Sequence, residues 1–241
     1  MRYHTYGFLM TALAVGESGA APDHETDLFD VQGCRLAVVC IGHGTLMFDY
    51  DGMIVHVDPV PAQSDYSRLP SADLILVTHE HQDHLAPALI DSILAPGGEI
   101  VANPSSQAKL GRGTALSNGS RATAKGIGIE AVPAYNTTPG RDKYHPKGRD
   151  NGYVLDFDGF RVYIAGDTEP IPEMRALGTI DVAFLPVNQP YTMTPAQAAD
   201  AARQISPRVL YPYHYGDTNV AELARLLADD DRIEVRIRRL A

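Results

Sequence analysis

The sequence has few cysteines and no long apolar run. Its two cysteines, Cys34 and Cys40, match no zinc-knuckle spacing. If both lie on one strand, they are about 20 Å apart and beyond disulfide reach, so we expect two core thiols. No stretch approaches the roughly 20 apolar residues that a membrane-spanning helix needs. The composition therefore argues against a zinc knuckle and against a membrane span.

Basic residues are also scarce, because 20 Lys and Arg are set against 30 Asp and Glu, a formal net charge of -10. A nucleic-acid-binding protein normally carries a basic stripe or patch. No such run occurs here. The arginines near the C-terminus alternate with Glu and Ile, as on a solvated strand face: Arg232, Arg236, Arg238 and Arg239. We therefore expect no nucleic-acid partner.

No linker-like or low-complexity stretch divides the chain, so we expect a single domain over residues 34–241. Residues 1–33 allow two interpretations, an N-terminal arm or a weak secretory signal. Arg2, a short apolar stretch and small residues up to Ala21 favour a signal, whereas Glu17 interrupts it. The protein is periplasmic if this signal functions and cytoplasmic otherwise.

Apolar stretches of strand length alternate with turn signals and a few segments of helical spacing. We expect strands over 36–41, 45–50, 53–57, 74–78, 99–102, 127–133, 153–157, 161–165, 182–186, 209–213 and 233–237. We expect helices over 85–94, 172–177, 194–205 and 220–228, the third capped by Thr194. This order predicts an α/β fold in which helices flank two stacked sheets.

The densest polar motif is His79-Glu80-His81-Gln82-Asp83-His84, between an expected strand and an expected helix. Residues two apart on an extended chain face the same way, so His79 and His81 can bind one metal ion. Where the chain turns toward the helix, Asp83 and His84 can bind a second ion. Imidazole and carboxylate groups are the usual ligands of zinc and also suit manganese, iron or nickel. The motif predicts two divalent ions, with zinc preferred.

Two further candidate ligands follow later strands. Asp167 comes after Ala165 and Gly166, which allow close backbone approach, so its carboxylate can bridge two ions. Its alternative role is to cap the following segment. His214 lies between two tyrosines at a strand end, where a packed core histidine is an equally good interpretation.

Taken in order, these motifs resemble the metallo-β-lactamase superfamily, and most closely its branch of ascorbate-6-phosphate lactonases and N-acyl phosphatidylethanolamine phospholipase D. The resemblance runs from about Leu36 to the C-terminus. Beyond the motifs above, it includes Ile41-Gly42-His43-Gly44, His56-Val57-Asp58-Pro59, Asn151-Gly152-Tyr153 and Tyr213-His214-Tyr215. It implies a four-layer αβ/βα sandwich of two mixed sheets flanked by helices, with the metals at one edge.

The resemblance also implies roles for single residues. The first ion's ligands are His79 and His81, the bridging carboxylate is Asp167, and the second ion's ligands are Asp83, His84 and His214. Near them, His43 and Asp58 are expected to orient the ligands or to contact substrate. For His43, a core histidine is the alternative.

One ligand position departs from the family pattern. The third histidine of the first ion usually follows the strand that matches residues 129–134, where this chain has Asn136. The nearest imidazole is that of His145, and Pro139-Gly140 can reverse the intervening chain. Catalytic zinc normally keeps three protein ligands, so we expect His145, rather than Asn136 or water, to complete this site. Lys147 and Arg149 would then attract an anionic substrate.

Two close ions lower the pKa of a shared water and stabilise the oxyanion that forms on attack. Asp83 is expected to orient the resulting hydroxide, and Asn136, Tyr191 or His145 to polarise the substrate. The predicted function is a metal-dependent hydrolase of a small ester, lactone or phosphodiester, while a homo-oligomer stays open. The alternatives are a mononuclear iron oxygenase of the same fold and a metal-binding protein without turnover. Complete ligands for a second ion argue against the first alternative, and the full ligand set argues against the second.

Overall fold

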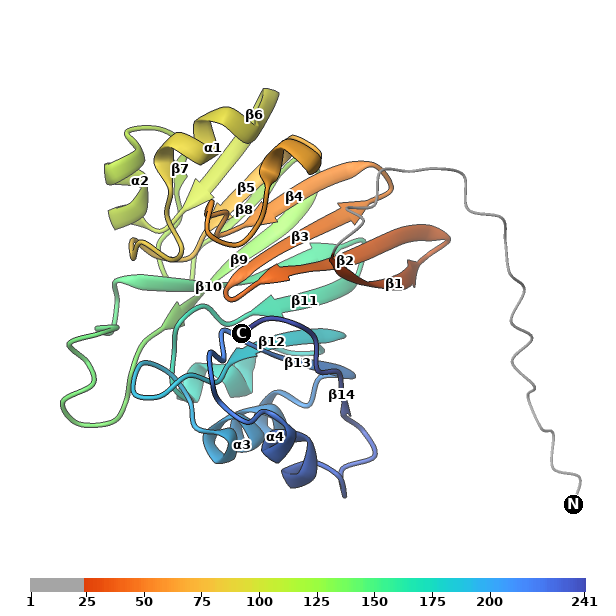
Figure 1. Ribbon diagram of the computed structural model, residues 1–241, viewed down its shortest axis with the longest axis vertical. Helices are drawn as coiled ribbons and strands as arrows, with labels where there is room; N and C mark the ends of the chain where they lie inside the picture. Colours follow the sequence, from red (N-terminus) through yellow and green to blue (C-terminus); the bar gives the residue numbers. More distant parts are fainter. Residues whose placement is uncertain (1–23) are drawn as a thin grey trace, which may run out of the picture.

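The structure, a computed structural model, describes residues 24–241. The possible signal segment in residues 1–23 lies outside the described residues. Two seven-stranded sheets pack face to face, and a few helices cover their outer faces (Figure 1). The predicted α/β sandwich of two mixed sheets flanked by helices is confirmed.

The first sheet follows the chain in simple order, from β1 to β7. Its strands are β1 (Glu25–Val31), β2 (Cys34–Gly42), β3 (Thr45–Tyr50), β4 (Met53–Val57), β5 (Ala72–Val77), β6 (Leu94–Ala102) and β7 (Thr114–Ala115). The strands from β1 to β4 pair antiparallel, and those from β4 to β7 pair parallel. The turn between β3 and β4 is tight because Asp51 and Gly52 both take positive φ angles, as predicted for a two-residue hairpin.

The second sheet repeats this arrangement, with an antiparallel half followed by a parallel half. Its strands are β8 (Arg121–Ala124), β9 (Ile127–Ala134), β10 (Asp150–Phe157), β11 (Phe160–Ile164), β12 (Val182–Pro186), β13 (Val209–Tyr213) and β14 (Glu234–Val235). Pairing is antiparallel from β8 to β11 and parallel from β11 to β14. Both sheets are therefore mixed.

The helices are short and lie outside the two sheets (Figure 1). They are α1 (Pro87–Ile93), α2 (Pro104–Leu110), α3 (Pro195–Ile205) and α4 (Ala221–Leu226), with 3-10 turns η1 (Tyr66–Arg68) and η2 (Pro172–Ala176). Thr194 caps α3 as predicted, and the Gln197 side chain accepts a hydrogen bond from the Thr194 backbone in return. Among residues 24–241, no helix is long and apolar enough to cross a membrane.

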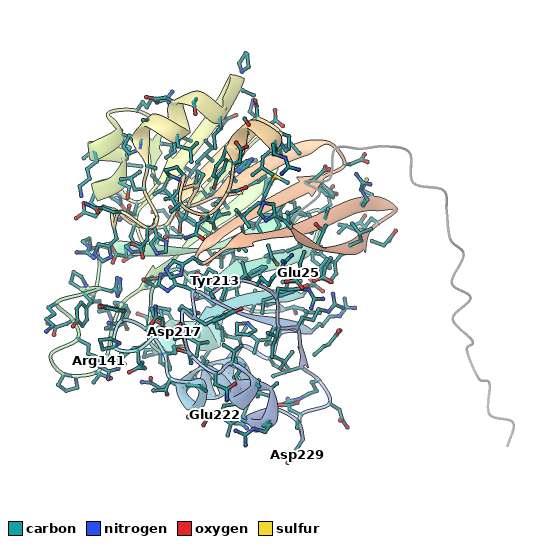
Figure 2. All side chains as sticks on the ribbon, viewed as in Figure 1. Glu25, Arg141, Tyr213, Asp217, Glu222 and Asp229 are labelled. Carbon is teal, nitrogen blue, oxygen red and sulfur yellow. The ribbon has the colours of Figure 1, made fainter. Side chains whose placement is uncertain are left out.

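The main core lies between the sheets, where side chains fill the space (Figure 2). Phe48 of β3 packs against Phe157 of β10 and Phe184 of β12, with ring centroids 5.9 and 6.3 Å apart. Separate apolar clusters lie beneath α3 and α4 and beneath α1. These clusters hold the helices against the outer faces of the sheets, so four layers form.

The first sheet begins before residue 34, where the domain was predicted to start. Its strand β1 starts at Glu25 and pairs with β2 along its whole length. Charged residues alternate with apolar ones in β1, as suits an edge strand, so it has no continuous apolar run. Asp27 of β1 binds Arg238 at 2.7 Å, which joins the two ends of the described chain. The predicted core position is also wrong for Cys34, which is half-buried, whereas Cys40 is buried.

Strand directions explain where polar side chains gather. β2, β4 and β5 of the first sheet run the same way, as do β9, β11, β12 and β13 of the second. The carboxyl ends of parallel strands meet at one edge of a sheet, which is a common position for ligand sites. The segments after these strands carry His43, Asp58, His79, His145, Asp167 and His214.

Candidate metal centre

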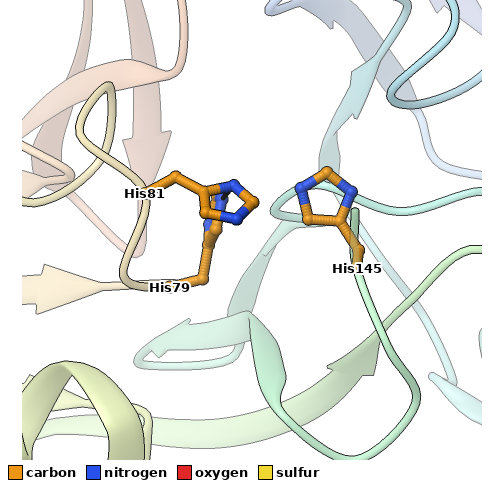
Figure 3. Close-up of side chains that lie close together, drawn as sticks. All are labelled: His79, His81 and His145. Carbon is orange, nitrogen blue, oxygen red and sulfur yellow. Dashed lines mark hydrogen bonds between the residues drawn. The ribbon is translucent and has the colours of Figure 1, made fainter. Parts of the chain in front are cut away.

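Three histidines form what we call the first donor set, together with Asp167. His79 and His81 follow β5, and His79 Nε2 lies 3.0 Å from His81 Nδ1. His145 comes from the loop between β9 and β10 and faces them from the opposite side (Figure 3). One ligand atom from each histidine lies within 4.8 Å of the others. His145 Nε2 is also 3.3 Å from Asp167 Oδ2.

The second donor set consists of Asp83, His84 and His214, again with Asp167. The chain turns at this point, because the His84 and Leu85 amides both donate to His81 O. The turn directs His84 away from His81 and toward His214, with their Nε2 atoms 3.1 Å apart. Asp83 Oδ2 lies 3.5 Å from His214 Nε2, and Asp167 Oδ1 lies 3.5 Å from His84 Nε2. Asp167 therefore lies between the two sets.

The chemistry of these atoms fits divalent cations. Ligands bound tetrahedrally at zinc's usual 2.0–2.1 Å are separated by about 3.4 Å, close to the separations within each set. His145 Nε2 and Asp167 Oδ1 are buried and make no hydrogen bond with any described residue. Buried polar atoms are normally paired, so these two atoms point to a bound group at this position.

Asp58 orients one histidine of each donor set, His84 directly and His79 through Thr78. It is fully buried, and its Oδ2 accepts a hydrogen bond from His84 Nδ1 at 2.8 Å. It also accepts the Thr78 hydroxyl at 2.6 Å, and Thr78 Oγ1 lies 3.0 Å from His79 Nδ1. Fixing the Nδ1 side of both rings leaves the two Nε2 lone pairs free for metal.

The structure brings His145, rather than Asn136, into the first donor set. His145 Nδ1 donates to Tyr191 O at 3.2 Å, so its Nε2 points toward Asp167. The Asn136 side chain donates to the same carbonyl and to Arg141 O, and its backbone amide donates to His145 O. Asn136 is buried outside the cavity described below, so it positions the loop and is not placed to polarise a substrate.

His43 lies beside the second donor set. Its Nε2 is 3.5 Å from Asp83 Oδ2, and its ring contacts that of His214 at an interplanar angle of 36°, with centroids 3.7 Å apart. The following glycine is required by space, because a Cβ on Gly44 would lie 2.7 Å from His84 Cε1. Gly166 has a φ of +65°, and a Cβ there would lie 2.6 Å from Asn151 O. Both glycines allow the strands to approach the centre closely.

The two sets open into a cavity of about 220 Å³. It is lined by His43, His81, Asp83, Tyr144, His145, Asp167, Asn188, Tyr191 and His214. Tyr144 and Asn188 were not predicted as site residues, although the sequence carries a signal for each. Tyr144 is the neighbour of His145, and Asn188 follows β12, whose carboxyl end meets the same edge. A groove of about 370 Å³ over β8 to β11 is larger but has no such donor group.

Neither basic residue expected to attract a substrate lines this cavity. Lys147 binds Glu173 at 3.3 Å and the Tyr135 hydroxyl at 3.1 Å. Arg149 pairs with buried Asp150 at 2.7 Å and donates to Tyr144 O. Both residues are thus paired with carboxylates, and Arg149 Nη2 also lies 3.4 Å from His81 Nε2 of the first donor set, so attraction of an anionic substrate by these residues stays a prediction.

Burial and charge set the protonation of the metal-free centre. Burial lowers the pKa of His84, but Asp167, Asp58 and Asp83 outweigh it and raise this pKa to about 9. Burial also raises the pKa of Asp167, but the neighbouring histidines, His214 and His84 first, bring it well below its ordinary value. For His79, burial dominates and lowers the pKa. His84 thus carries a proton where the second donor set needs a lone pair.

Zinc affinity is therefore expected to rise with pH. Below a pH of about 9 the metal must displace the His84 proton, and this cost falls as the pH approaches that value. Competition with a chelator at several pH values between about 7 and 9 measures the effect. Asp58→Asn removes one carboxylate that raises the His84 pKa. In this variant the rise of zinc affinity with pH should therefore be complete at a lower pH than in the wild type. A wild-type affinity that does not change over this range would contradict the assignment.

Comparison with known proteins agrees with this geometry. Residues 37–214 match the beta-lactamase superfamily domain. A UPF0173 metal-dependent hydrolase of Thermococcus kodakarensis is 32% identical over 81% of this chain and 93% of its own length. A crystal structure from Parabacteroides distasonis, assigned as a metal-dependent hydrolase, is 58% identical, with a TM-score of 0.88 over 90% of this chain and 100% of that chain.

A second structure is more distant. Igni18, a metallo hydrolase of Ignicoccus hospitalis, is 26% identical, with a TM-score of 0.71 over 86% of this chain and 96% of its own. Fold, donor chemistry and relatives lead to the same assignment. The chain belongs to the beta-lactamase superfamily and, within it, to the UPF0173 metal-dependent hydrolases.

Proposed function

We propose that this metal-dependent hydrolase uses two divalent ions, zinc first among them, to cleave a small ester, lactone or phosphodiester. The observation that carries the proposal is the position of Asp167 between two donor sets. Its Oδ2 lies 3.3 Å from His145 Nε2 and 3.4 Å from His214 Nε2. A carboxylate in this position can bridge two ions at the separation typical of hydrolytic centres.

When bound, two ions lower the pKa of a shared water and stabilise the charge that develops on the substrate. The protein's own residues then set the geometry. Asp83 is half exposed and is held by His43 and His214, so it can orient the attacking water. Asn188 also lines the cavity, and its side chain makes no hydrogen bond with another described residue, so its amide can donate to a substrate oxygen.

The cavity limits the substrate. A volume of about 220 Å³ suits a small molecule. Tyr144 and Tyr191 line it and contact each other edge to face, with centroids 5.0 Å apart. Their rings offer an apolar surface for the part of the substrate that does not react. The choice of lactone or phosphodiester rests on the sequence resemblance to that branch of the superfamily.

The alternatives require less than the site offers. A mononuclear iron oxygenase of this fold needs one donor set, whereas candidate ligands lie on two sides of Asp167, which favours two ions. A metal-binding protein without turnover needs no cavity against its donors, whereas five of the seven proposed ligands line one: His81, Asp83, His145, Asp167 and His214. Both features favour a two-ion hydrolase.

The proposal is tested by assaying zinc-loaded and manganese-loaded protein against lactones, phosphodiesters and thioesters. His81→Ala should empty the first donor set, and Asp83→Ala should weaken the second and misdirect the attacking water. Each variant should fold, as circular dichroism would establish, and lose at least about a hundredfold in kcat/KM. Wild-type rates in both variants would exclude the mechanism.

A further inference from the structure

The first donor set depends on a residue that the strands do not position. β9 ends at Ala134 and β10 begins at Asp150, and His145 lies in the loop between them (Figure 1). A histidine at a strand end is held by the sheet, but a ligand this far along a loop needs other contacts. The origin of those contacts decides how well the first ion is bound.

Four of the loop's contacts converge on one buried carboxylate, that of Glu169. Its Oε2 accepts hydrogen bonds from the backbone amides of Thr137 and Thr138, at 2.7 and 2.6 Å, and from the Thr137 hydroxyl at 3.2 Å. Its Oε1 binds Arg141 at 3.2 Å. Arg141 lies in the projecting loop on the left of Figure 2. Glu169 is fully buried, so these bonds are not exchanged with water.

Glu169 also belongs to the segment that supplies the central carboxylate. Asp167 lies two residues earlier, and its Oδ2 is 3.3 Å from His145 Nε2. The Thr168 hydroxyl and the Glu169 amide both bond to the Tyr135 backbone at the start of the loop. Residues 167–169 therefore contact the first donor set directly and also hold the loop that supplies His145.

We infer that Glu169 is a positioning residue that holds His145 in the first donor set. It does not ligate metal. This role rests on the proposed two-ion centre. A carboxylate suits the role because four donors approach its two oxygens, whereas a glutamine offers one oxygen and an NH2 group that would face a donor. Glu169→Gln should therefore loosen the loop while leaving the sheets unchanged.

The test is a zinc titration of metal-free protein in competition with a chromophoric chelator, which resolves the affinity of each site. Glu169→Gln should weaken about tenfold the same site that His145→Ala weakens, and should leave the other site unchanged. In the His145→Ala background it should cause no further loss. Glu130→Gln is the matched control, because Glu130 also pairs with arginines, Arg121 and Arg161, but lies away from the centre.

Unchanged zinc affinity in Glu169→Gln, an equal loss at both sites, or additive losses in the double variant would overturn the inference. If Glu169→Gln does not fold, Arg141→Ala removes one contact from the exposed side and should weaken the same site about threefold. Unchanged zinc affinity in Arg141→Ala would also overturn the inference. A wild-type protein that binds one ion would contradict the proposed function, whereas a non-additive loss at that ion would still support the role of Glu169.

Discussion

Asp167→Ala is expected to abolish stable binding of both ions, which is the largest effect in the centre. One oxygen of Asp167 contacts histidines of both donor sets, with Oδ2 3.3 Å from His145 Nε2 and 3.4 Å from His214 Nε2. Without it each ion keeps only three ligands, and the negative charge shared by the two donor sets is lost. Zinc affinity at each site should fall by more than about a hundredfold, and turnover should fall with it.

The control is Asp181→Ala, because Asp181 is another ion-paired carboxylate, bound to Arg208 at 3.1 Å, but lies outside the centre. Its zinc content after dialysis should equal that of the wild type. If Asp167→Ala retained both ions at wild-type affinity, the two donor sets would not share this carboxylate.

His145→Ala is expected to produce the second-largest effect, confined to the first donor set. This set keeps His79, His81 and Asp167, and loses an imidazole that is buried and fixed by Tyr191 O. Zinc affinity of this site should fall ten- to a hundredfold or more, while the second site keeps its affinity. Chelator competition with metal-free protein measures both.

Asn136→Ala is the comparison for this experiment. Asn136 supports the loop through Tyr191 O and Arg141 O and does not line the cavity, so its loss should weaken the first site less than loss of His145. A larger loss of affinity in Asn136→Ala than in His145→Ala would make Asn136 the ligand.

Local patterns explain why much of the fold could be predicted from the sequence. Buried strands such as β5 and β12 are continuous apolar runs, and α3 carries its own capping box. Elements without such patterns were missed. β1 alternates charged and apolar residues, and α2 has only one buried side chain, that of Ser106. Segment 172–177 was expected to be a helix but is the 3-10 turn η2, which has no side-chain cap.

The candidate site likewise contains residues that local sequence predicts and residues that it does not. His79, His81, Asp83 and His84 lie within six residues, so their facing directions follow from an extended chain and a turn. The contacts of Thr78, Asn188 and Glu169 depend on which strands lie side by side, and no local pattern reports that. For His145, the lack of another imidazole near the strand end led to the prediction, and the loop's hydrogen bonds provide the physical reason for its position.

Metal content of the purified protein tests the central claim most directly. After saturation with zinc or manganese and removal of free metal, elemental analysis should give about two ions per chain, because two donor sets share Asp167. The His145→Ala variant, treated in parallel, should retain about one. A reproducible value of one ion in the wild type would contradict the two-ion centre and favour a mononuclear enzyme.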